Sequence, residues 1–233
     1  MKIHIGVDNF PLHLAYIRRS CDAAEIATFA NSLPRRKTLN QWHEDAPRGF
    51  RHIINVPRAL TDPAWRKDKP SSYREGAQGF VPSAEREFIW EQLDKAAGVL
   101  RVNTFLFQTG ITFRPTLQNM QNFKEFITSR KRKNYRFVWE PSGLWGTAEA
   151  IDFAAPLDLH VAQDPLAEEF EPTEEAFRYF RVKNLRSGTG ISQMGFEEIY
   201  EASVGADRVF VVFCTPKPLT DARKFRAFLS EIQ

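Results

Sequence analysis

Residues 103–140 read NTFLFQTGITFRPTLQNMQNFKEFITSRKRKNYRFVWE, and this stretch decides the fold. Two short runs of aromatic and β-branched residues, at 103–108 and 136–140, flank a helix-like stretch at 115–129. A strand, a helix and a second strand in this order are typical of a βα unit built around a parallel sheet.

The same pattern recurs along the whole chain. Strand-like runs are predicted at 2–8, 23–28, 51–56, 103–108, 136–140, 157–162, 178–183 and 208–214. Further helices are predicted at 37–45, 82–97, 192–203 and 219–230, whereas the stretches after the first, fifth and sixth runs are short or irregular. A chain of 233 residues is close to the usual size of a β/α barrel. The sequence therefore predicts an α/β fold, a single (β/α)8 TIM-type barrel that occupies residues 1–233 as one domain.

The composition is that of a folded globular protein, with 42% hydrophobic and 26% charged residues. The two cysteines, Cys21 and Cys214, are far apart and have no metal-ligand spacing, so we expect reduced thiols in a cytoplasmic protein. No apolar run approaches the roughly 18 residues that span a bilayer, and no membrane association is expected. The net charge of +3 is compatible with an anionic ligand.

Several segments, taken in order, resemble the domain of unknown function 72 (YecE-like) family. They are AEIATF (24–29) with a following LP, APRGFRHIINVPR (46–58), FLFQ (105–108), FVWEPSGLW (137–145), HVAQDP (160–165), YFRV (179–182) and VFVVF (209–213). The resemblance implies a TIM-type barrel with a polar pocket and no established activity. Asn55, Asp62, Ser142 and Lys183 differ from the residues typical of that family, which keeps an inactive barrel scaffold as a hypothesis.

Alternation along the strands indicates which side chains line the pocket of such a barrel. If Gln108 and Glu140 face inward, the large rings of their strands face outward under the helices, where they belong. The same rule assigns polar residues of the other strands to the inner face. The predicted pocket contains His4, Asp8, Glu25, Asn55, Gln108, Glu140, His160, Asp164, Arg181 and Lys183.

Glu140 and Glu25 are the candidate catalytic residues. A carboxylate at a strand end is costly to bury unless it is paired or used, and two such groups could act as acid and base on a sugar-like substrate. The alternative for Glu140 is a structural ion pair with Arg181. The candidate substrate-binding residues are Asp8, Asn55, Gln108, Asp164, Arg181 and Lys183.

Two further ligand classes stay open. The two catalytic carboxylates with Asp164 and His160 could hold a divalent metal, although no metal-binding motif supports this and no metal ligand is assigned. The long connection at 57–81, which is either a lid, a binding loop or a mobile loop, interleaves rings with cations as nucleic-acid surfaces do. Those side chains are Trp65, Arg66, Lys67, Lys69, Tyr73 and Arg74. The basic run at 130–133 is better explained by its place at a helix end.

The leading hypothesis is an enzyme of hydrolase or isomerase type that uses pocket carboxylates for acid/base chemistry on a small anionic or sugar-like substrate. In it, Arg181 and Lys183 orient the anion. A nucleic-acid-binding or processing protein is the alternative. The sequence predicts neither the substrate nor the oligomeric state.

Overall fold

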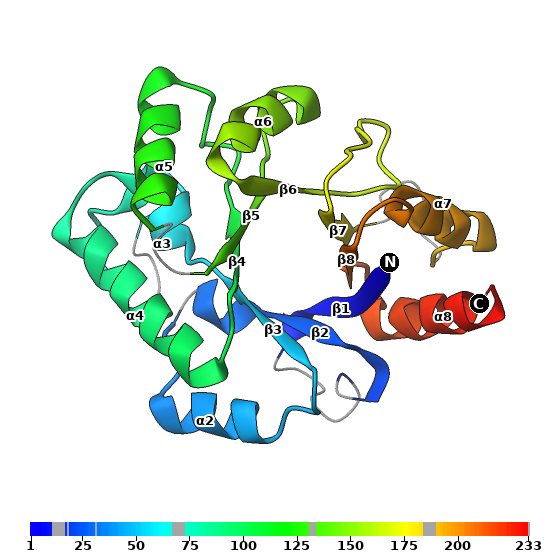
Figure 1. The fold of residues 1–233 in the computed structure, drawn as a ribbon. Coiled ribbons are helices and arrows are strands. Elements are labelled where there is room, and N and C mark those ends of the chain that lie inside the picture. Colours follow the sequence, from blue (N-terminus) through cyan, green and yellow to red (C-terminus); the bar gives the residue numbers. More distant parts are fainter. Residues whose placement is uncertain are drawn as a thin grey trace. The chain divides into compact units, whose positions relative to one another are not determined.

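The computed structural model contains eight parallel strands that close into a barrel in chain order (Figure 1). They are β1 (Lys2–Phe10), β2 (Ala23–Ile26), β3 (Arg51–Asn55), β4 (Thr104–Gln108), β5 (Arg136–Glu140), β6 (Leu159–Gln163), β7 (Phe177–Val182) and β8 (Arg208–Phe213). The structure describes residues 1–10, 17, 19–30, 32–66, 73–130, 134–183 and 190–232, with only the backbone of residues 9 and 10. All eight predicted strands are present, and the predicted (β/α)8 barrel is confirmed.

The chain forms two compact units. Unit 1 consists of Met1–Ile26, Pro47–Arg51 and Ala162–Gln233, and unit 2 of Ala27–Ala46 and His52–Val161. Within unit 1, β1 pairs with β2 and β8, and β7 pairs with β6 and β8. Within unit 2, β4 pairs with β3 and β5, and β5 pairs with β6. That residues 1–233 make one domain stays a prediction.

Helices follow most of the strands. They are α2 (Arg36–Glu44), α3 (Arg58–Thr61), α4 (Ala84–Leu100), α5 (Leu117–Arg130), α6 (Thr147–Ala154), α7 (Gln193–Ser203) and α8 (Pro218–Glu231), with short 3-10 turns at Ala27–Ala30, Gln78–Phe80 and Ala155–Leu157. All five predicted helices are present within about three residues of their predicted bounds. Among the residues that the structure describes, no helix has both the length and the apolar character needed to cross a membrane.

Helix α6 shows where the sequence prediction was wrong. The stretch after the fifth strand was expected to be short or irregular and no helix was predicted there, but it contains this eight-residue helix. Its N-cap residue is Gly146, which has no side chain to cap the helix. A helix of two turns is also too short to show a clear hydrophobic periodicity. The stretch after the sixth strand is irregular, as expected, and most of the stretch after the first lies outside the described residues.

The connection at 57–81 is partly ordered by packing. It contains the four-residue helix α3 and the 3-10 turn Gln78–Phe80. Tyr73 is fully buried, and its hydroxyl donates a hydrogen bond of 2.6 Å to the carbonyl oxygen of Phe29. Phe80 is fully buried as well and stacks on Phe123 with ring centroids 4.4 Å apart. Tyr73 and Phe80 of this connection are therefore part of the hydrophobic core of unit 2.

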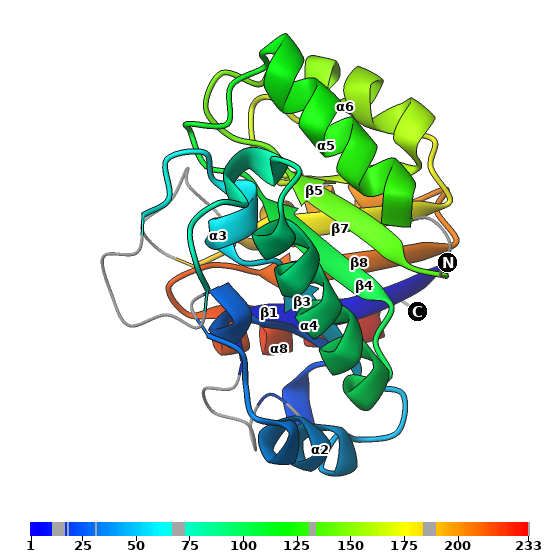
Figure 2. The same ribbon diagram turned by 90° about the vertical axis from the view of Figure 1, so that its left-hand side faces the viewer.

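Aromatic rings fill the space between strands and helices in unit 2. Helices α4 and α5 lie over the strands β4 and β5 (Figure 2). Trp90 of α4 packs against Phe105 of β4 and Phe137 of β5, and Phe126 of α5 contacts Phe107. The odd-numbered rings of β4 and β5 thus lie under the helices, as alternation predicts. The even-numbered residues of these strands occupy the opposite face of the sheet.

In unit 1 the aromatic contacts lie on both faces of the sheet. Tyr179 of β7 stacks on Phe210 of β8, with centroids 5.8 Å apart. On the helix side Phe213 packs against Phe225 of α8, and Phe196 of α7 contacts the same ring. The two helices thus cover one face of this sheet and leave the other to Tyr179 and its neighbours.

Candidate functional site

In unit 2 the carboxyl ends of three neighbouring strands carry a chain of polar side chains. Asn55 ends β3, Gln108 ends β4 and Glu140 ends β5. The Asn55 amide donates to Gln108 Oε1 at 3.2 Å, and Gln108 Nε2 donates to Glu140 Oε2 at 2.7 Å. Glu140 is 9% exposed. The strand register places Gln108 directly beside Glu140, so the amide of one strand orients the carboxylate of the next.

A second set of hydrogen bonds fixes the backbone around this carboxylate. The backbone N–H of Thr109 donates to the carbonyl oxygen of Glu140 at 3.1 Å. Trp139 Nε1 donates to the Thr109 hydroxyl at 2.9 Å, and the Ser142 hydroxyl donates to the Thr109 carbonyl at 2.5 Å. The loops after β4 and β5 are thereby tied together, and Glu140 projects from a rigid strand end.

Asp62 is a buried carboxylate of this unit that the sequence analysis did not include in the site. It follows α3 and accepts hydrogen bonds from the Arg58 guanidinium, the Thr112 hydroxyl and the backbone N–H of Ala64. Burial acts to raise the pKa of Asp62, but these bonds outweigh it and hold the pKa below its ordinary value. Asp62 lies beyond the end of β3, where strand alternation makes no prediction. The signal in the sequence was that Asp62 differs from the residue typical of the family that the chain resembles.

Unit 1 holds a different arrangement, built around Glu25 of β2. Its carboxylate is fully buried and accepts three hydrogen bonds: from the Tyr179 hydroxyl at 2.9 Å, from Arg181 Nε at 2.9 Å and from Arg181 Nη2 at 3.0 Å. Asp8 lies 3.7 Å from Arg181 Nη2. Burial, followed by the charge of Glu25, raises the pKa of Tyr179 far above its ordinary value, so this hydroxyl stays a donor.

This geometry favours a structural role for Glu25. A two-pronged pair with Arg181, completed by Tyr179, satisfies a buried carboxylate that would otherwise be very costly. Because its carboxylate oxygens already accept these hydrogen bonds inside the protein, Glu25 is a weaker acid/base candidate than Glu140. Its catalytic role, the pairing of Glu140 with Arg181 and the acid/base pairing of Glu25 with Glu140 stay predictions.

Asp164, predicted to bind substrate, has partners in the backbone. Its Oδ1 accepts from the N–H of Leu166 and its Oδ2 from the N–H of Lys183, at 3.0 and 2.9 Å. The carboxylate thus holds the turn after β6 against the end of β7. That Arg181 and Lys183 bind an anionic substrate stays a prediction.

The metal hypothesis has no geometric support in the part of the chain that the structure describes. There, no three side chains of His, Cys, Asp or Glu are grouped so that they could hold an ion. His160 lies on β6 opposite Val138 of β5, and Asp164 is engaged as above.

One aromatic side chain of the predicted nucleic-acid-binding loop is not exposed. Tyr73, expected to stack on bases, is fully buried and bonded to Phe29, so it is no stacking platform. Trp65 is half-buried, and Arg66 and Arg74 are exposed. Two further cations of the expected surface, at positions 67 and 69, lie outside the described residues, as do positions 131–133 of the basic run.

Comparison with known proteins places this architecture among relatives. The family described as "Protein of unknown function DUF72" matches residues 7–158. A DUF72 family protein from Enterococcus faecalis V583 gives a TM-score of 0.71 at 14% identity, over 99% of this chain and 95% of that chain. One from Thermotoga maritima MSB8 gives 0.66 at 17% identity, over 99% and 100%.

More distant barrels also align. A xylose isomerase domain containing protein from Salmonella typhimurium LT2 gives a TM-score of 0.61 at 10% identity, over 98% of this chain and 97% of that chain. The curated proteins give no match. At such identities the likeness to solved structures shows the fold.

Proposed function

Since the chain belongs to the DUF72 family of proteins of unknown function, we propose that it is an enzyme of hydrolase or isomerase type in which Glu140 transfers protons on a small anionic or sugar-like substrate. Family membership fixes the barrel and leaves the reaction open. The proposal therefore rests on one observation, the nearly buried Glu140 carboxylate that Gln108 orients at the end of β5. We place the protein in a reducing cytoplasm, with Cys21 and Cys214 as thiols.

The position of Glu140 supports this role. Active sites of β/α barrels are built at the carboxyl ends of the strands, and residues at these ends carry the chemistry. A general acid or base must also be rigidly placed, because proton transfer requires a hydrogen-bond distance to the reacting group. Glu140 meets this condition through its strand, through Gln108 and through the backbone bond from Thr109.

The polar side chains around Glu140 have different roles in the proposed reaction. Gln108 Nε2–H stabilises the ionised carboxylate, and Asn55 holds the Gln108 amide in the orientation that presents this donor. In the proposed reaction the Glu140 carboxylate removes a proton from a substrate carbon or hydroxyl group. In an isomerisation it then returns that proton to another atom of the substrate. In a hydrolysis the carboxylate instead takes the proton from the water molecule that attacks the substrate, and the leaving group receives that proton as its bond to the substrate breaks. Asp62, kept ionised by its three donors, contributes negative potential and no proton transfer.

The substrate class is the least constrained part of the proposal. One distant structural neighbour carries the name of a sugar isomerase domain, and we use that name only to choose compounds for a screen. A thermal-shift screen would cover sugars, sugar phosphates, nucleotides, divalent metals and short DNA. A ligand at about 100 times its dissociation constant stabilises the folded state by about 2.7 kcal/mol, which corresponds to roughly 5 to 10 °C for a chain of this size.

The decisive comparison is between wild type and Glu140→Gln, with Glu197→Gln as the matched control on the exposed surface of α7. We expect Glu140→Gln to fold and to lose the shift, while the control keeps it. Turnover of the hit compound by wild type alone, followed by NMR, would establish the reaction.

Three results would contradict the proposal. Unfolding of Glu140→Gln would show that this carboxylate is structural. Silence across the whole panel favours the inactive scaffold. A shift with DNA that falls steeply with salt favours the nucleic-acid hypothesis, because phosphate contacts release counterions.

A further inference from the structure

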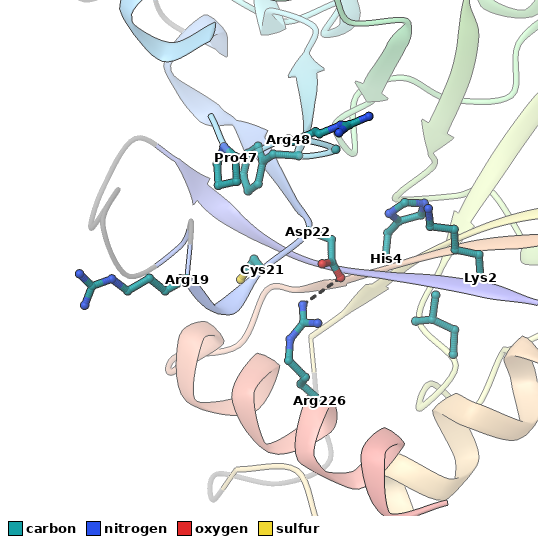
Figure 3. A pocket seen from close by; sticks show the side chains of 11 residues that line it. Lys2, His4, Arg19, Cys21, Asp22, Pro47, Arg48 and Arg226 are labelled. Atoms are coloured by element: carbon teal, nitrogen blue, oxygen red, sulfur yellow. Dashed lines mark hydrogen bonds and ion pairs between the residues drawn. The ribbon is translucent and has the colours of Figure 1, made fainter. Parts of the chain in front are cut away.

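A second polar cavity lies in unit 1, at the amino-terminal ends of β1 and β2 (Figure 3). Its volume is about 480 Å³. It is lined by Lys2, Ile3, His4, Arg19, Cys21, Asp22, Pro47, Arg48, Gly49, Phe50 and Arg226. These residues come from β1, the entry to β2, the loop before β3 and helix α8, so the cavity exists only once four separate segments have come together.

The cavity has a strong surplus of positive charge. Lys2, Arg48 and Arg226 approach it from β1, the loop and α8, and Arg19 lies at its edge and points away from them (Figure 3). Within the described ranges of the chain, Asp22 is the single carboxylate of the lining. Arg226 pairs with Asp22, so the charges of Lys2 and Arg48 form a surplus that a bound anion would neutralise.

Asp22 is already committed to the protein itself. Its Oδ2 accepts from the backbone N–H of Ile5 at 3.1 Å and from Arg226 Nη2 at 2.9 Å. Among the residues that the structure describes, Lys2, Arg19 and Arg48 form no ion pair, and all three are exposed. The charges of Lys2 and Arg48 are therefore available to a ligand in the cavity, whereas Arg19 points away from it.

His4 senses the electrostatic potential of this cavity. Its ring is buried and stacks on Phe210 at 4.7 Å. The pKa of His4 is lowered to about 4, mainly by burial; the charges of Lys2, Arg208 and Arg51 act in the same direction, and Asp22 opposes them. The imidazole is consequently neutral at pH 7 and adds no charge, but it can exchange a hydrogen bond with a ligand.

We propose that this cavity binds a phosphorylated small molecule, with Lys2, Arg48 and Arg226 contacting its phosphoryl oxygens. A phosphate dianion matches the charge surplus, and the planar guanidinium fork suits its oxygens. The volume lies in the range of small-molecule sites, about 300 to 1,000 Å³. A nucleic-acid strand would need a continuous groove with successive rings, whereas the lining offers Phe50.

The site is distinct from the proposed chemistry. Glu140 stands at the carboxyl end of a strand of unit 2, whereas this cavity lies at the amino-terminal ends of strands of unit 1. In β/α barrels the chemistry occurs at the carboxyl ends. Cys21 offers no nucleophile here, since burial raises the pKa of its thiol to about 12. The bound molecule is thus a ligand that is not transformed at this site.

The test uses inorganic pyrophosphate and glucose 6-phosphate in calorimetric titrations of the full chain, at about 0.05 M salt where screening is weak. We expect one molecule per chain. Lys2→Gln and Arg48→Gln should each weaken binding about fivefold or more, the effect of removing one exposed charge at about 4 Å. Arg36→Gln, an exposed cation of α2, is the charge-matched control and should change affinity less than twofold.

An independent readout comes from the His4 ring. Saturating pyrophosphate should raise the pKa of His4 toward its ordinary value of 6.5, as followed by NMR with a His4→Gln variant for assignment. Two results would overturn the proposal. One is that neither phosphate compound binds at millimolar concentrations. The other is that affinity falls equally in Lys2→Gln, Arg48→Gln and the control Arg36→Gln. Binding of single-stranded DNA that strengthens with its length and displaces pyrophosphate would overturn it as well.

Discussion

Replacing Glu25 with glutamine removes the negative member of a buried ion pair while leaving its shape almost unchanged. Arg181, whose side chain is 7% exposed, would then lack its two-pronged partner and retain Asp8 at 3.7 Å. The Tyr179 hydroxyl would lose a charged acceptor. We therefore expect Glu25→Gln to destabilise the folded state, and to do so more than most single substitutions.

The magnitude follows from the burial of the pair. Removing one partner of a buried ion pair costs about 3 to 5 kcal/mol, because the charge that stays behind loses its closest counter-charge. For a chain of this length that corresponds to a melting temperature lower by roughly 6 to 20 °C. Glu91→Gln is the matched control, since Glu91 pairs with Lys95 at 2.7 Å with both side chains 61% exposed. That change should cost at most about 0.5 kcal/mol.

Urea unfolding followed by circular dichroism measures both variants against wild type. The denaturation midpoint multiplied by the slope of the free energy against urea concentration gives the free energy of unfolding in water. An unchanged slope shows that the same surface becomes exposed on unfolding. A Glu25→Gln protein that is as stable as the control variant would refute the structural role argued from this geometry. It would also return Glu25 to the candidates for proton transfer.

Three further substitutions test the packing and the electrostatics. Gly143→Ala should lower the free energy of unfolding by about 1 to 3 kcal/mol, because φ of Gly143 is +76° and a Cβ there would lie 2.9 Å from the Ile111 Cα. The control Gly98→Ala in α4, where a Cβ would meet open space, should instead raise the free energy of unfolding by up to about 1 kcal/mol. Urea unfolding measures both variants. Phe80→Ala should cost about 3 to 5 kcal/mol in the same assay, because a fully buried ring leaves a cavity; a loss below 1 kcal/mol would contradict its place in the core. As the pH falls from 6.5 to 4, the unfolded chain takes up a proton at His4 that the folded protein does not, so the free energy of unfolding should fall by on the order of 1 to 3 kcal/mol. In His4→Gln the free energy of unfolding should depend less steeply on pH. An equal pH dependence in the variant and the wild type would contradict the lowered pKa of His4.

The candidate site could be predicted in part from local pattern. Strand alternation correctly sent Phe105 and Phe107 under the helices, and it thereby placed Gln108 on the other face, beside Glu140. This worked because adjacent side chains of a strand point to opposite faces whatever the rest of the chain does. The hydrogen bond between Gln108 and Glu140 was not predicted, and it became evident only from the register of the two strands in the structure.

Other features depend on residues far apart in the chain. Glu25 and Arg181 are 156 positions apart, and the sequence suggested a different carboxylate as the partner of Arg181. Tyr73 looked like part of an exposed binding loop, yet its ring is buried and bonded to Phe29. Neither contact has a local signature, because each depends on which segments meet after the strands have assembled.

The sequence by itself determined the barrel, the order of its strands and the faces of β4 and β5, since hydrophobic periodicity and strand length act over a few residues. The tertiary structure alone decided which charges pair, which ring of the 57–81 connection is buried, and that Lys2, Arg48 and Arg226 share one cavity. The physical reason is that ion pairs and cavities depend on the register and packing of segments distant in sequence. Propensity and periodicity carry no information about such contacts.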